Sequence, residues 1–85
     1  MNVLHAIADE LKEVIPEAAM EFRDHNPTLF VIVRNRRCRI TVRDDALTVE
    51  ILMGHSLTVE EHSINLNDPG PLHGLMRYLV HYFRR

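Results

Sequence analysis

Three runs of apolar residues between positions 29 and 53 constrain this 85-residue chain more than any other feature. Side chains of a β-strand point to opposite faces in turn, so alternation of apolar and polar residues is typical of a half-buried strand. The second and third runs alternate in this way, and their apolar members are Cys38, Ile40, Val42, Leu47, Val49, Ile51 and Met53. The sequence therefore predicts a β-meander with an apolar face that another layer must cover.

The first run and the two turns complete this predicted meander. Residues 29–33 are apolar at every position, which is typical of a strand covered on both faces or lying inside a sheet. Residues 34–37 form the first predicted turn, and Asn35 tolerates positive φ, so we expect it in a two-residue hairpin loop. Asp44 and Asp45 predict the second turn by the same chemistry.

An amphipathic helix is predicted before the meander. Its apolar residues recur at helical spacing and are Val3, Leu4, Ile7, Ala8, Leu11, Val14 and Ile15. Asn2 is the expected N-cap. Pro16 disfavours the helical conformation at the residue before it, so the helix should end near Val14.

A second amphipathic helix is predicted at the end of the sequence. Asp68 is a strong N-cap, and Pro69 suits the first helical position. The apolar residues that follow lie on one stripe, namely Leu72, Leu75, Met76, Leu79, Val80 and Phe83. Arg84 and Arg85 place positive charge at the negative end of the helix dipole.

Two segments leave alternatives open. Residues 17–24 fit a short helix after Pro16, or a strand in which Ala18, Met20 and Phe22 share one face, and we favour the strand. In residues 57–66 the apolar positions change from odd to even numbers across residues 60–62. A β-bulge there would restore the inward register. Alternatively, the strand ends near Glu61 and a loop begins at Ile64.

These elements predict a single α+β domain over residues 1–85. We expect a two-layer sandwich: an N-terminal helix, an antiparallel β-meander of three to five strands and a C-terminal helix, with both helices on one face of the sheet. A hydrophobic fraction of 46% argues against disorder. No apolar run approaches the length of a membrane span, no signal peptide is recognisable, and a single cysteine favours a reducing cytoplasm.

Charge is segregated along the chain. Residues 1–24 carry a net charge of −4, residues 25–43 of +5, residues 44–68 of −6 and residues 69–85 of +3. Such alternation does not create the uniform field that steers polyanions, but it does create a local basic patch.

No catalytic, cofactor-binding or metal-binding signature is recognisable, so we expect a protein that is not an enzyme. His73 and His81 are eight residues apart on one predicted helix, too far for a zinc pair one turn apart. His55 and His62 are separated by an odd number, which places them on opposite faces of a regular strand. Adjacent acids such as Glu60 and Glu61 are typical of solvated surface rather than of an acid–base pair.

Two candidate partner-binding surfaces remain. The first is the arginine-rich hairpin of residues 34–43, and the second is the outer side of the last helix, whose residue types are common at interface hot spots. The candidate residues are Arg34, Arg36, Arg37, Arg39, Arg43, Arg77, Tyr78, His81 and Tyr82. The structural alternatives are that the outward arginines pair across the sheet with Glu50 and that the tyrosines cover the core edge.

The order helix–meander–helix resembles that of double-stranded-RNA-binding domains. Such domains present lysines at the start of their second helix, whereas residues 68–74 contain none, so the resemblance ends at the architecture. The small size also resembles that of phage or plasmid accessory proteins that act on a host complex. We therefore expect a protein–protein interaction domain of inhibitor or adaptor type, with an acidic protein or a second copy as partner. The alternative is a nucleic-acid-binding module that uses hairpin 34–43; no aromatic residue lies among its arginines to stack on bases.

Overall fold

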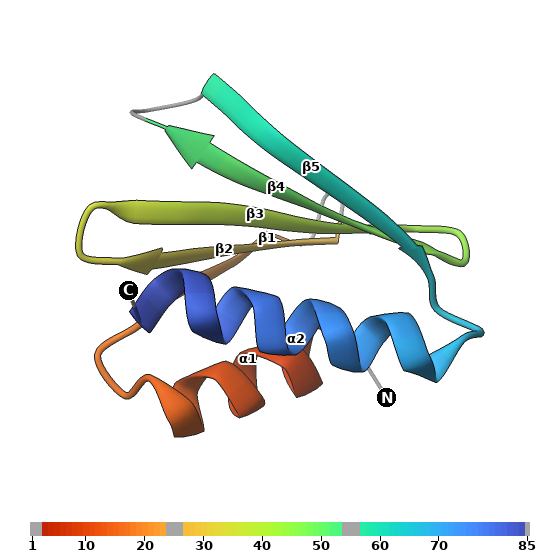
Figure 1. Cartoon of the computed structure of the whole chain (residues 1–85), viewed down its shortest axis with the longest axis horizontal. Helices are drawn as coiled ribbons and strands as arrows, with labels where there is room; N and C mark the ends of the chain where they lie inside the picture. The colour runs from red at the N-terminus through yellow and green to blue at the C-terminus, as the bar shows by residue number, and fades with distance from the viewer. Residues whose placement is uncertain (1–2, 24–26, 54–56, 85) are drawn as a thin grey trace.

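The computed structural model describes residues 3–23, 27–53 and 57–84. A helix, five strands and a second helix follow one another along the chain (Figure 1). They are α1 (Val3–Val14), β1 (Ala19–Arg23), β2 (Thr28–Val33), β3 (Arg36–Arg43), β4 (Ala46–Met53), β5 (Leu57–Asn65) and α2 (Pro69–Arg84). The predicted α+β fold class is confirmed, at the upper end of the expected strand number.

The sheet is a simple meander. Its strands are ordered β1-β2-β3-β4-β5, and each pairs antiparallel with the next, as short hairpin connections require. Both helices lie on the same face of this sheet, side by side and running in the same direction (Figure 1). Neither of the two helices in the described residues covers the opposite face, which is called the outer face below.

The core lies between the helices and the inner face of the sheet. The predicted alternation is confirmed, because the odd-numbered residues of β2 and β4 and the even-numbered residues of β3 point inward. Inward side chains that are almost completely buried are Leu29, Val31, Val33, Cys38, Ile40, Leu47, Val49 and Ile51. The helices cover them with Leu4, Ile7, Leu11, Leu75, Met76, Leu79 and Phe83, which are also buried.

The two open alternatives are resolved by the pairing of the edge strands. Residues 17–24 contain strand β1, which pairs with β2 from Ala19 opposite Ile32 to Arg23 opposite Thr28, so the strand prediction is confirmed. Strand β5 is continuous to Asn65, and the prediction of a loop starting at Ile64 is wrong. Its register shift lies opposite Ile51 and Leu52. The irregularity therefore comes slightly earlier in β5 than the change of apolar phase indicated.

The second hairpin turn forms where it was predicted, and the first needs two corrections. Arg36 and Arg37 were predicted in the turn, but they belong to β3 and pair with Val33 and Ile32, so the loop consists of Arg34 and Asn35 alone. The first turn contains Asn35, but the positive φ of 59° belongs to Arg34. The second turn has its positive φ, 55°, at Asp44. The alternation of β2 and β3 fixes the strand ends, so Arg34 must occupy the left-handed region, which costs a residue with a Cβ atom about 1 kcal/mol.

Local hydrogen bonds set the helix ends. Helix α1 ends at Val14, as predicted, and Lys12 Nζ reaches over the following turn to donate to the carbonyl oxygen of Ala18 at 2.7 Å. Asp68 caps α2, since its Oδ1 accepts a hydrogen bond from the amide of Gly70 at 3.2 Å. The expected roles of Asn2 and Arg85 lie outside the described residues.

Candidate functional site

The two surfaces predicted from the sequence meet at one end of the molecule. Nη1 of Arg36, at the start of β3, donates a hydrogen bond to the carbonyl oxygen of Tyr82 in the last turn of α2. The Arg36 guanidinium also lies 5.4 Å from the centroid of the Tyr82 ring. We call Arg34, Arg36, Arg37 and Tyr82 the basic end.

The five hairpin arginines do not all lie on one surface. Arg36 reaches toward α2, and Arg34 is exposed in the turn. Arg37, Arg39 and Arg43 have odd numbers on β3, so they point to the outer face, opposite to Cys38 and Ile40. The hairpin therefore presents basic groups in three directions.

Arg39 is engaged in a cross-strand ion pair. Its Nε and Nη2 donate to Oε1 and Oε2 of Glu50 on β4 at 2.9 and 2.7 Å, and Thr58 donates to Oε2 at 2.9 Å. These hydrogen bonds lower the pKa of Glu50, and the bond to Glu50 raises the pKa of Arg39. The predicted pairing of an outward arginine with Glu50 is confirmed for Arg39.

An aromatic ring does lie among the outward arginines, contrary to the sequence prediction. Phe30 stands directly opposite Arg39 in the β2–β3 register, and the Arg23 guanidinium lies 4.8 Å from the centroid of its ring. These residues border a hollow of about 1040 Å³ on the outer face, which Arg43 also lines. Phe30 precedes the hairpin of residues 34–43 in the sequence, and the β2–β3 register places it beside Arg39.

The two predicted tyrosines both contact the sheet, Tyr82 through Arg36 of β3 and Tyr78 through the edge strand β5. The hydroxyl of Tyr78 donates to Oε1 of Glu60 on β5 at 2.5 Å, and Nε2 of His62 lies 2.5 Å from the same oxygen. The rings of His62 and Tyr78 are 5.0 Å apart between centroids. Tyr78 thus belongs to a polar cluster that joins α2 to β5, which is a structural role.

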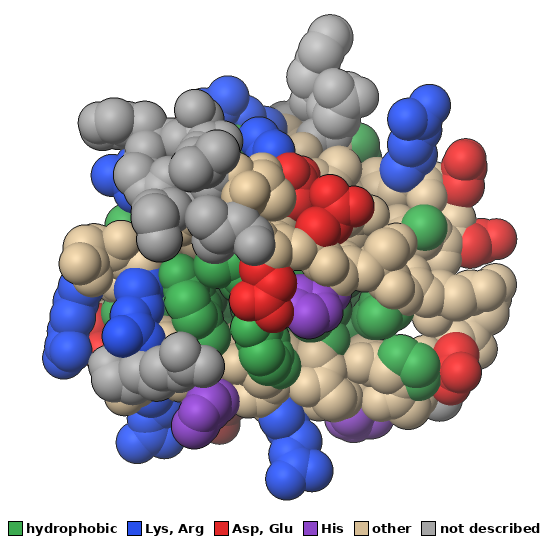
Figure 2. Space-filling model, turned by 45° about the horizontal axis from the view of Figure 1, so that its top comes forward, with side chains coloured by type: hydrophobic (Ala, Val, Ile, Leu, Met, Phe, Trp, Pro, Cys, Tyr) green, Lys and Arg blue, Asp and Glu red, His purple; other side chains and the backbone are tan. Residues whose placement is uncertain are grey.

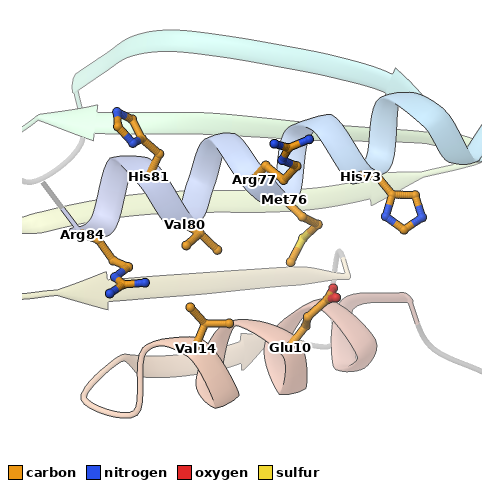
Figure 3. Close-up of a pocket in the computed structure, with 8 residues that line it drawn as sticks. All are labelled: Glu10, Val14, His73, Met76, Arg77, Val80, His81 and Arg84. Atoms are coloured by element: carbon orange, nitrogen blue, oxygen red, sulfur yellow. The ribbon is translucent and has the colours of Figure 1, made fainter.

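Arg77 and His81 lie on the other side of α2, where a groove separates it from α1 (Figure 3). The groove encloses about 480 Å³. Its apolar side chains are Val14, Met76 and Val80, and its polar ones are Glu10, His73, Arg77, His81 and Arg84. Glu10 and Val14 from α1 were not among the predicted site residues, although the 42% exposure of Val14 marks it as an unusual surface residue.

Charge segregation along the chain is also visible on the surface. In the face that Figure 2 shows, Lys and Arg side chains gather mainly toward the left, and Asp and Glu side chains mainly toward the right. Hydrophobic side chains are exposed between them. On this face, positive and negative side chains therefore lie mainly on opposite sides.

Within residues 3–23, 27–53 and 57–84, no group of three or more His, Cys, Asp or Glu side chains could hold a metal ion. No helix in the same ranges is long and apolar enough to cross a membrane. No protein-family model, curated protein or solved structure matches this chain.

Proposed function

We propose that this protein is an interaction domain of inhibitor or adaptor type that binds an acidic segment of a partner protein at the basic end. The observation that carries the proposal is the contact of Arg36 with both the carbonyl oxygen and the ring of Tyr82. This contact joins an arginine-rich hairpin to a tyrosine-bearing helix end, and Arg and Tyr are the residue types enriched at interface hot spots.

The charges of the basic end support an acidic partner. Residues 33–37 and 76–84 contain no Asp or Glu. Arg34 and Arg37 form no ion pair with another described residue. Their guanidinium groups can therefore make bidentate hydrogen bonds to carboxylates without first breaking an existing pair.

Selection from a displayed library of random peptides tests this proposal. Peptides that bind the protein should be enriched in Asp and Glu, and a double variant, Arg34→Glu with Arg37→Glu, should bind them at least about tenfold more weakly. Arg43→Glu is the matched control, because Arg43 lies at the far end of the same strand. Selected peptides without acidic residues, or equal losses in the control, would contradict the proposal.

The outer face supports a second candidate function, the binding of single-stranded nucleic acid. The specific observation is the stack of Arg23 on Phe30 beside Arg39, because bases stack on aromatic rings and on guanidinium planes. It ranks second because Glu50 and Asp44 line the same hollow and reduce its positive charge. A labelled oligothymidylate should then bind with an affinity that falls steeply with salt, and Phe30→Ala should abolish binding.

A further inference from the structure

The exposed face of α1 is acidic. Asp9, Glu10 and Glu13 are all exposed on it. The one lysine of the helix, Lys12, donates its ammonium hydrogen bond to the carbonyl oxygen of Ala18. Lys12 keeps its positive charge, and three acids against this one lysine leave α1 with a net charge of −2.

The exposed face of α2 is basic. Its sequence, Pro69–Arg84, contains no acid. His73, Arg77, His81 and Arg84 are exposed along it and line the groove. The helical layer thus presents an acidic stripe and a basic stripe side by side, with the exposed Val14 and the half-buried Val80 between them.

The two stripes are level with each other along the helices. In Figure 3, Glu10 on α1 lies level with Arg77 on α2 along the helix direction, and Val14 lies level with Val80. The helices run in the same direction. Neither Glu10 nor Arg77 forms an ion pair with another described residue, so both charges are available to a partner.

From this arrangement we infer that the helical layer is the interface of a symmetric homodimer. A two-fold axis parallel to the helices would place α2 of one copy across α1 of the other, so that each contact occurs twice. Glu10 would then face the partner's Arg77, and Val14 would pack against the partner's Val80. This inference concerns the helical layer alone and is independent of the basic end.

A second copy fits this layer better than other occupants because the layer carries both charges. An acidic peptide or a nucleic acid would complement the stripe on α2 and be repelled by the stripe on α1. A basic ligand would have the opposite mismatch. A second copy presents the same acidic and basic stripes in exchanged positions, so it complements both stripes of the layer. Repulsion between like charges disfavours the acidic and basic ligands.

A charge-exchange experiment tests the homodimer. Light scattering after size-exclusion chromatography should give twice the chain mass of 9.9 kDa for the wild type. Glu10→Arg and Arg77→Glu should each shift this mass to that of the monomer, because each places like charges across the interface. When the two variants are mixed, the expected result is a heterodimer. Position 10 then faces position 77 of the other chain with opposite charge at both of the symmetry-related contacts.

Controls separate this interface from folding and from the basic end. Circular dichroism of each single variant should retain the wild-type spectrum, and recovery of the dimer on mixing shows independently that both chains are folded. Arg34→Glu, which changes the basic end, should remain dimeric. A wild-type monomer at every accessible concentration would overturn the inference, as would folded single variants that remain dimeric.

Discussion

The guanidinium of Arg36 donates a hydrogen bond to the carbonyl oxygen of Tyr82, a residue 46 positions later in the chain. The carbonyl groups in the last turn of a helix have no partner within the helix and carry its negative partial charge. Arg36 therefore supplies both a donor and a positive charge to the C-terminus of α2. The same side chain fixes the position of the hairpin against the helix.

Replacing Arg36 by Ala should lower the free energy of unfolding by about 1–2 kcal/mol, the combined size of a charged hydrogen bond and a helix-dipole interaction. Arg34→Ala is the matched control in the same hairpin, and it should change the stability by less than about 0.5 kcal/mol. Urea unfolding monitored by circular dichroism measures both. Equal effects of the two substitutions would show that Arg36 has no special structural role.

Acidification should weaken the pair between Arg39 and Glu50. Its hydrogen bonds lower the pKa of Glu50 in the folded state, so the folded protein binds fewer protons than the unfolded chain. The pair's contribution to the free energy of unfolding is complete above the pKa of Glu50 in the unfolded chain, about 4.3. It is lost as the pH falls through the lower pKa of Glu50 in the folded protein.

The variant Glu50→Gln isolates this contribution. Its unfolding free energy should lie about 1 kcal/mol below that of the wild type near pH 7, since the pair is partly exposed. The difference should shrink at pH values below about 4. A difference that is constant over this pH range would assign the loss to packing or to the Thr58 hydrogen bond instead of the charge.

The architecture could be predicted because it depends on local patterns. Period-two alternation located β3 and β4, and the capping chemistry of Asp68 located the start of α2. These signals act over a few residues, where side-chain direction follows directly from the backbone conformation. The register of a hairpin follows from its turn, so the pairing of Arg39 with Glu50 in the β3–β4 hairpin could also be predicted from the sequence.

The site depends on contacts between segments that are distant in sequence, and there the prediction was incomplete. The pairing of Phe30 with Arg39 can be predicted only from the exact register of the β2–β3 hairpin, and the sequence located the turn of this hairpin only approximately. To predict the contact between Arg36 and Tyr82, one must know the angle at which α2 packs on the sheet. The apolar stripe of α2 predicts only which face of the helix is buried. The sequence pattern predicts Glu60 to be a solvated residue, although the inward register of β5 places Glu60 and His62 beside Tyr78.

The hydrogen bond between Tyr78 and Glu60 should stabilise the packing of α2 on β5. Tyr78→Phe removes the donor but keeps the ring, so the free energy of unfolding should fall by about 1 kcal/mol. A double-mutant cycle with Glu60→Ala, which removes the acceptor, measures the coupling of the two residues directly, and we expect about 0.5–1 kcal/mol. Strictly additive losses would mean that the contact contributes nothing to folding.

Cys38 should be chemically inert in the folded protein. Its side chain is fully buried in β3, and desolvation raises the pKa of the thiol to about 12. The thiolate is the reactive form, so a disulfide reagent near pH 8 should label the native protein far more slowly than the protein in denaturant. Rapid labelling under native conditions would contradict the burial of this residue.

The same pKa difference predicts a loss of stability in alkali. The unfolded thiol ionises above about pH 8.5, while the folded thiol stays neutral until about pH 12, so the unfolding free energy should decrease as pH rises between these values. Cys38→Ala separates this effect from the other groups that titrate in alkali. The variant should be less stable near pH 7 because it leaves a small cavity, yet its stability should fall less steeply between about pH 9 and 11. Parallel pH profiles of the two proteins would show that the thiol ionises equally in both states.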